Sequence, residues 1–136
     1  MKKQLVVLVL IFSVLFFLAA SCEESNAIGS EDDIAIAGTI FHLDTTYTYI
    51  DKLIAEGTVE NNGSQTITPT WYVEGQFYAD SSFVVKLGGA NLSFNFPLEI
   101  GQTTYWKLEF TSDVADVTEF PNFAVGELRA LYHPTT

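Results

Sequence analysis

The sequence predicts an all-β domain, built as a sandwich or barrel of packed sheets, that follows an N-terminal signal peptide. From Ile34 onward, apolar and polar residues alternate with a period of two, the pattern of strands that bury one face. Glycine, proline, asparagine, aspartate or serine interrupts the alternation at short intervals, as at turns between strands. Aromatic residues make up 14% of the chain, which suits pleated, half-buried surfaces. Such strands must pack sheet against sheet.

The N-terminus has the pattern of a signal peptide helix at residues 1–21. Lys2 and Lys3 precede an apolar run at 5–20, and small residues lead up to Cys22. A basic start, an apolar core and small residues at the end predict a secretory signal peptide. The run falls short of the about 20 apolar residues that a spanning helix needs.

The segment that ends at Cys22 resembles the lipobox of bacterial lipoproteins of the Bacteroidota type. The resemblance implies a lipid on this cysteine, the only one in the chain, which explains an odd cysteine in an exported protein. It implies that the membrane is a partner and that the protein resides in the cell envelope, at the outer membrane. Ordinary secretion after cleavage and an uncleaved anchor helix are the alternatives.

Residues 22–33 are rich in acidic and polar side chains, which predicts a flexible acidic tether. The remaining residues, 34–134, are enough for one domain with its own core. Without residues 1–21, four basic residues face seventeen acidic ones, a net charge of −13. Such a surface repels phosphate backbones, so we expect no nucleic-acid partner.

The alternation gives seven strands, at 34–40, 52–60, 71–80, 83–89, 92–98, 105–110 and 123–132. Each has one apolar face, for which the clearest residues are Leu53, Ala55, Gly57, Val59, Trp71, Val73, Phe77, Phe83, Val85, Leu87, Leu92, Phe94, Trp106, Leu108 and Phe110. We expect Gly57 to allow a bulge or close packing. The residues at 61–63 suit a hairpin turn. Within 112–121, Ser112 or Asp113 is expected to cap one short helical turn.

Three segments, 55–64, 71–80 and 98–108, resemble in order and spacing the strand motifs of domains of the FxLYD type. The first carries Gly-x-Val-x-Asn-x-Gly, the second ends in an aromatic residue and an aspartate, and the third turns at a glycine before an aromatic strand. This resemblance implies an immunoglobulin-like antiparallel β-sandwich of about seven strands in a cell-envelope protein. It implies no activity, because the family has no catalytic residues to carry over.

No catalytic set is recognisable, so we expect a protein that is not an enzyme and has no cofactor. His42 and His133 would meet only if the first and last strands pair, and with Asp44 they are an alternative metal site. Glu74 and Glu109 are both on polar strand faces, which argues against use as a hydrolytic pair.

One acidic group is left open as a calcium site. It consists of Asp113, Asp116 and Glu119, which have oxygen ligands but not the glycine-containing spacing of a calcium loop.

One group of residues favours binding. Three tyrosines of outward parity are next to polar side chains, and exposed aromatic rings can anchor a protein or stack on sugars. The candidate face consists of Tyr72, Glu74, Gln76, Tyr78, Tyr105 and Lys107, with Tyr47 and Tyr49 near it. The sequence therefore predicts a lipid-anchored, non-catalytic interaction or accessory module with a protein partner. A surface carbohydrate-binding module is the alternative, and a row of tyrosines that only covers a polar sheet is a third interpretation.

Overall fold

The computed structural model describes residues 33–133, which form an all-β sandwich of two antiparallel sheets. This confirms the predicted fold class. The predicted signal peptide (1–21), the lipid attachment residue Cys22 and, except for Asp33, the tether 22–33 lie outside the described residues. Within 33–133, no helix is long and apolar enough to cross a membrane.

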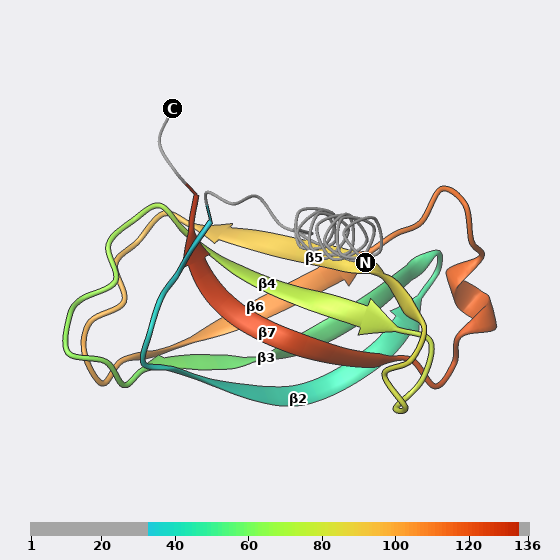
Figure 1. Cartoon of the computed structure of the whole chain (residues 1–136), viewed down its shortest axis with the longest axis horizontal. Helices are drawn as coiled ribbons and strands as arrows, with labels where there is room; N and C mark the ends of the chain where they lie inside the picture. The colour runs from blue at the N-terminus through green and yellow to red at the C-terminus, as the bar shows by residue number, and fades with distance from the viewer. Residues whose placement is uncertain (1–32, 134–136) are drawn as a thin grey trace, which may run out of the picture. The chain divides into compact units, whose positions relative to one another are not determined.

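Seven strands and one short 3-10 helix make up the domain (Figure 1). In chain order they are β1 (Ile34–Ala35), β2 (Thr39–Tyr49), β3 (Lys52–Asn61), β4 (Trp71–Tyr78), β5 (Lys86–Phe94), β6 (Thr103–Phe110), η2 (Val117–Glu119) and β7 (Ala124–Tyr132). The β4 sheet has the strand order β1-β7-β4-β5, and the β3 sheet has the order β2-β3-β6. This division into four and three strands is that of a seven-strand immunoglobulin-like sandwich.

The core lies between the sheets and is made of the inward faces that the alternation predicts. Trp71 and Phe77 of β4 are fully buried, and they share one apolar cluster with Trp106 of β6. The rings of Phe77 and Phe110 stack across the two sheets with centroids 5.3 Å apart. The buried members of this cluster all lie within 53–130, so the domain has a hydrophobic core of its own and can fold as an independent unit.

Gly57 occupies a point of close approach in the β3 sheet, as predicted. Opposite it, the register of β2 shifts between Leu43 and Thr45, which marks a bulge. A Cβ at position 57 would lie 1.9 Å from the carbonyl oxygen of His42 and 2.6 Å from the ring of Trp106. Only glycine fits between the bulge and the indole ring.

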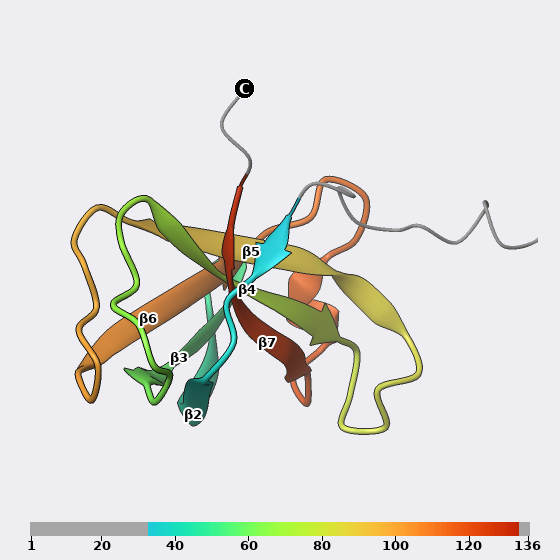
Figure 2. The same cartoon turned by 60° about the vertical axis from the view of Figure 1, so that its left-hand side comes forward.

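The predicted number of strands is right, but the strand boundaries are wrong in two regions of the chain. The strand expected at 34–40 is two strands, because the chain leaves the β4 sheet after β1 and joins the β3 sheet as β2 (Figure 2). β2 also continues to Tyr49, beyond the predicted end.

The strands expected at 83–89 and 92–98 are instead the single strand β5. It continues through Gly88 and Gly89, which both pair with β4. Glycine is needed at these two positions because the Phe110 ring and the Gln76 side chain occupy the space that a side chain would take. Residues 83–85 precede it in a connection.

The hairpin turn expected at 61–63 is absent, because β3 leads through residues 62–70 into the other sheet. Asn61 is buried and its side chain ties this connection together. Its Nδ2 donates to the carbonyl oxygens of Gln65 and Leu98, each at 2.9 Å, and its Oδ1 accepts from the backbone N of Gly63 at 3.0 Å. Asparagine often occurs in turns, but here the buried side chain of Asn61 stabilises the connection through its hydrogen bonds.

The short helical turn expected within 112–121 is present as η2, but its cap is Asp116 rather than Ser112 or Asp113. The carboxylate of Asp116 accepts from the backbone N of Thr118 at 3.0 Å. Ser112 accepts hydrogen bonds from the backbone N–H groups two and three residues later, which forms a separate turn.

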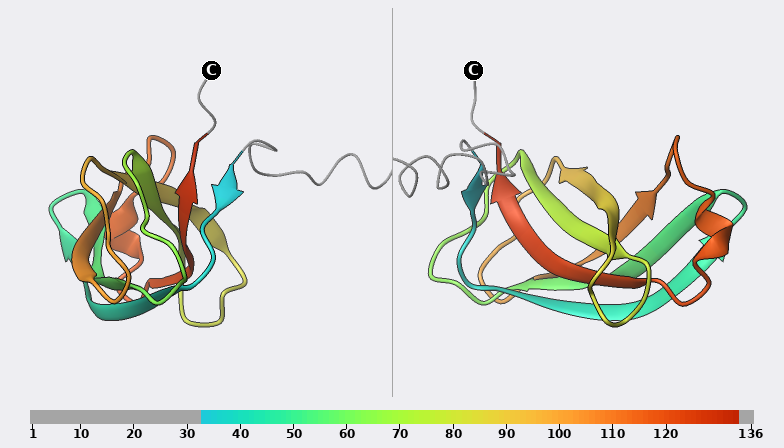
Figure 3. Two further views of the ribbon diagram at one scale, coloured as in Figure 1. Left: turned by 90° about the vertical axis from the view of Figure 1, so that its left-hand side faces the viewer. Right: turned by 45° about the vertical axis from the view of Figure 1, so that its right-hand side comes forward.

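The sandwich has two ends, which the strand pairing defines (Figures 1 and 3). The Asn61 end consists of the connections 36–38, 62–70 and 95–102. The Val84 end consists of the connections 50–51, 79–85 and 111–123. The domain begins and ends at the Asn61 end, where β1 pairs with the last residues of β7. Asp33 and His133, the first and last described residues, are joined there by a 2.6 Å contact between Oδ1 and Nδ1.

Candidate functional site

The six residues of the predicted binding face lie on different sheets. Tyr72, Glu74 and Gln76 are on the outward side of β4, whereas Tyr105 and Lys107 are on the outward side of β6. The outer faces of two packed sheets point in opposite directions. The structure therefore corrects the predicted single face, because alternation identifies the outward side of a strand but not the sheet to which the strand belongs.

Tyr78, the sixth residue, is only 8% exposed. Its ring packs edge-on against Phe83, with centroids 5.2 Å apart, and the Nζ atom of Lys86 is 5.8 Å from its centroid. Burial and a hydrogen bond to Glu127 raise the pKa of Tyr78. A register shift after Phe77 explains why the simple alternation fails here.

On the outward side of the β4 sheet, the predicted residues pair with neighbours in the same domain. The ring of Tyr72 packs on the imidazole of His133, with centroids 4.0 Å apart. Glu74 accepts a hydrogen bond from Nε of Arg129 at 2.6 Å. The side chain of Gln76 covers the backbone of β5. All three predicted residues of this face are therefore engaged by neighbours within the domain.

The outward side of the β3 sheet gathers three tyrosines with charged residues. We call it the tyrosine face, and its members are Tyr47, Tyr49, Glu56, Tyr105, Lys107 and Glu109. Tyr105 is 78% exposed, the most exposed ring among the described residues. The strand register places Tyr47 in one row with Glu109 and Tyr49 opposite Lys52, and Tyr105 is next to Lys107 on the outward side of β6, so all three tyrosines border charged residues.

A chain of exposed ion pairs crosses the tyrosine face. Nζ of Lys107 lies 3.8 Å from Glu56 and 3.6 Å from Glu109, which in turn lies 3.4 Å from Nζ of Lys52. The hydroxyl of Tyr47 donates to Glu56 at 2.8 Å, and this bond raises the pKa of Tyr47. Exposed pairs contribute at most about 1 kcal/mol each, so they orient side chains more than they stabilise the fold.

The carboxylates considered for hydrolysis are far from forming a pair. Glu74 is bound by Arg129 on the β4 sheet, whereas Glu109 faces outward from the β3 sheet. Of the two histidines, His42 is on β2 of the β3 sheet and His133 follows β7 of the β4 sheet. The first and last strands do pair, but His42 is not on the first strand.

Metal ligation needs several donor side chains around one point. Within residues 33–133, no group of three or more His, Cys, Asp or Glu side chains is arranged to hold a metal ion. In the candidate calcium group, Asp116 is bonded to Thr118, while Asp113 and Glu119 are exposed.

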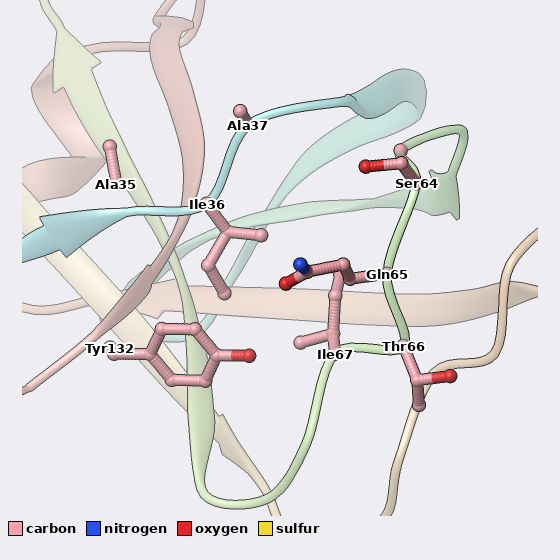
Figure 4. A pocket seen from close by; sticks show the side chains of 9 residues that line it. Ala35, Ile36, Ala37, Ser64, Gln65, Thr66, Ile67 and Tyr132 are labelled. Carbon is pink, nitrogen blue, oxygen red and sulfur yellow. The ribbon is translucent and has the colours of Figure 1, made fainter.

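A small hollow lies at the Asn61 end, between the segment after β1 and the connection 62–70 (Figure 4). It has a volume of about 260 Å³ and is lined by Ala35, Ile36, Ala37, Gly63, Ser64, Gln65, Thr66, Ile67 and Tyr132. The hydroxyl of Tyr132 accepts from the backbone N of Thr68 at 3.2 Å. The lining has no carboxylate, imidazole or amine, so the hollow offers contact surface rather than acid–base chemistry.

The sequence reasoning missed the surface at the Val84 end. Its connections carry large apolar side chains in solvent, namely Ile50, Phe83, Val84, Val85 and Val114. Val84 is 79% exposed and Val114 is 98% exposed. The available signal was the run of three apolar residues at 83–85, which breaks the alternation directly after a turn.

Comparison of the chain with protein-family models, with curated proteins and with solved structures gives no match in any of the three. The resemblances to lipoproteins and to FxLYD-type domains therefore stay predictions from the sequence.

Proposed function

We propose that this chain is a lipid-anchored protein of the cell envelope, at the outer membrane, that acts as a non-catalytic interaction module. One observation carries the proposal. The exposed apolar side chains of the Val84 end are at the opposite end of the sandwich from Asp33, where the chain from the predicted anchor enters. Clustered exposed apolar groups mark interaction surfaces in soluble domains. An anchor on one side and a binding surface on the other would present the module to a protein partner.

The length of the predicted tether supports this arrangement. Residues 23–33 span at most about 40 Å when fully extended. That reach would hold the Asn61 end within about 40 Å of the membrane and leave the Val84 end free to meet a partner. The acidic surface argues against docking on anionic lipid, so the acyl chains on Cys22 would provide the attachment.

The anchoring half of the proposal is tested with Cys22→Ala in a bacterial host, with Ser13→Ala as the matched control. We expect the parent chain and Ser13→Ala to incorporate labelled palmitate and to sediment with membranes. Cys22→Ala should do neither, and globomycin should block processing of the parent chain. If the parent chain stays at the membrane without lipid, the proposed anchor is wrong.

A glycan ligand is the second candidate, and the tyrosine face favours it. Tyr105, Tyr47 and Tyr49 border charged residues that can hydrogen-bond to sugar hydroxyls. A glycan array read with the parent domain and with Tyr105→Ala and Tyr47→Ala tests this candidate. Tyr72→Ala, on the other sheet, is the control. Absence of glycan binding, or binding that all three variants retain, rejects a sugar ligand at this face.

A further inference from the structure

We infer that the Val84 end binds a protein whose contact surface is an apolar patch bordered by lysine or arginine side chains. This inference rests on the proposed interaction function and adds the chemistry of the partner. Its basis is the combination of exposed apolar side chains, backbone conformations that hold them outward, and a one-sided distribution of charge.

Exposed apolar side chains lie on all three connections of the Val84 end. Ile50 is 74% exposed in the turn between β2 and β3, and Val84 and Val85 are exposed in the connection between β4 and β5. Val114 lies on the connection that leads to η2. Pairing of Tyr78 with both Lys86 and Ala124 places the last residues of the second and third connections at the same end of the β4 sheet.

Two of the connections hold their apolar residues at a conformational cost. Ile50 has φ 54° and Phe83 has φ 56°, a region that glycine or asparagine usually occupies and that is unfavourable for branched or bulky side chains. The ring of Phe83 packs against Tyr78 and over Gly126, which leaves the next two residues, the valines, in solvent. Such strain persists where surrounding structure imposes it, and it clusters at functional sites.

The charge at this end has one sign. Its three connections contain five carboxylates and no lysine, arginine or histidine, and the five are Asp51, Asp80, Asp113, Asp116 and Glu119. All five are exposed. The nearest lysines are engaged, since Lys52 pairs with Glu109 at 3.4 Å and Lys86 pairs with Glu127 at 3.2 Å.

Hydrogen bonds favour the charged form of two of these carboxylates. Ser82 donates to Asp80, and Thr118 donates to Asp116, and these bonds lower the pKa of both aspartates. These two carboxylates therefore stay charged to a lower pH than an ordinary aspartate. Complementary charge across an interface raises the association rate and disfavours partners of the wrong sign.

Charge also argues against other occupants of the surface. A second copy would bring five further carboxylates against these five, and like charges at an interface are unfavourable. An anionic membrane would be repelled in the same way. A partner with basic residues around an apolar patch satisfies both parts of the surface.

The test uses residues 23–136 and three synthetic amphipathic peptides in which leucine alternates with lysine, glutamate or serine. We expect the leucine–lysine peptide to bind at least about tenfold more tightly than the other two in titration calorimetry. Val84→Ser combined with Val85→Ser should weaken this binding by about tenfold or more. Ile100→Ser, an exposed apolar residue of the Asn61 end, is the matched control and should change it less than about twofold.

A second pair of measurements isolates the charge. Asp51→Asn combined with Asp113→Asn should weaken binding of the lysine peptide, and so should an increase in salt from about 50 to about 300 mM. If the glutamate and serine peptides bind equally well and lose affinity in the valine variant, the end binds apolar surfaces without charge selection. The inference about the partner then fails, while the proposed interaction function stands.

Two other outcomes also overturn the inference. Lysine-peptide binding that the valine variant leaves unchanged would place the peptide elsewhere on this acidic domain. Binding to phosphatidylcholine vesicles, or dimerisation in the ultracentrifuge, that depends on the two valines would identify a lipid or a second copy as the occupant.

Discussion

The two ends of the sandwich differ in how their connections are held. At the Asn61 end, hydrogen bonds join one connection to another. Ile67 and Leu98 exchange backbone bonds at 2.9 Å, and the indole N–H of Trp71 donates to the carbonyl oxygen of Phe96. At the Val84 end, each hydrogen bond found for the connections in the described chain stays within its own connection, as between Asp80 and Ser82.

The ends also differ in charge and in exposed apolar surface. The connections of the Asn61 end contain one carboxylate, Glu99, against five at the Val84 end. Both non-glycine residues with positive φ in connecting segments, Ile50 and Phe83, belong to the Val84 end. The connections of the Asn61 end therefore support the fold, whereas those of the Val84 end can carry residues that the fold itself does not need.

The largest expected effect is at the Asn61 end. Asn61→Ala removes two donated bonds and one accepted bond, so it should lower the free energy of unfolding by about 3 kcal/mol. Urea denaturation measures this change, and Asn62→Ala, on an exposed neighbour, is the control. Equal effects of the two variants would remove the basis for treating Asn61 as the support of this end.

At the Val84 end we expect the opposite sign. Ile50→Asn should raise the free energy of unfolding by about 1 kcal/mol, because asparagine accepts positive φ and isoleucine does not. Ile100→Asn replaces another exposed isoleucine, at the Asn61 end, and should give no gain. If thermal unfolding shows Ile50→Asn to be neutral or destabilising, the turn is not strained.

The exposed valines should matter little to the fold. Val84→Ser combined with Val85→Ser is expected to change the free energy of unfolding by less than about 0.5 kcal/mol, because both side chains are already in solvent. Val73→Ser, in the core of β4, should be strongly destabilising in the same assay. A large loss in the exposed pair would mean that these valines support the fold.

The smallest effect concerns pH. The pKa of Asp116 is lowered in the folded protein, so its charge stabilises the fold above the unfolded-state pKa of about 4, and this contribution is lost as the pH falls through the lower folded-state value. Asp116→Asn should therefore melt below the parent at pH 7, and the difference should shrink in acid. Asp113→Asn is the control, and a difference that grows in acid would contradict the assignment.

Alternation alone was enough to predict the inward sides of β3, β4 and β6. It missed Ile54 and Tyr78, which have the outward parity but are buried. It could not predict the strand order. Tyr72 and Tyr105 have the same outward parity, yet their strands belong to different sheets, which only long-range pairing decides.

The Val84 end was missed for a related reason. Phe83 and Val85 fit the alternation of a strand, but the positive φ of Phe83 turns the chain out of the sheet. Asn61 was assigned to a hairpin turn because burial of a turn-forming residue has no local signature. Backbone geometry and long-range hydrogen bonds, rather than composition, decide both positions.

Hydrogen exchange of residues 23–136, free and with the leucine–lysine peptide, tests the difference between the ends most directly. We predict slow exchange of the Ile67 and Leu98 amides in both samples, and fast exchange in 79–85 and 111–123 that slows only when the peptide is present. Peptide-induced protection at 62–70 and 95–102 instead, with the Val84 end unchanged, would contradict the account.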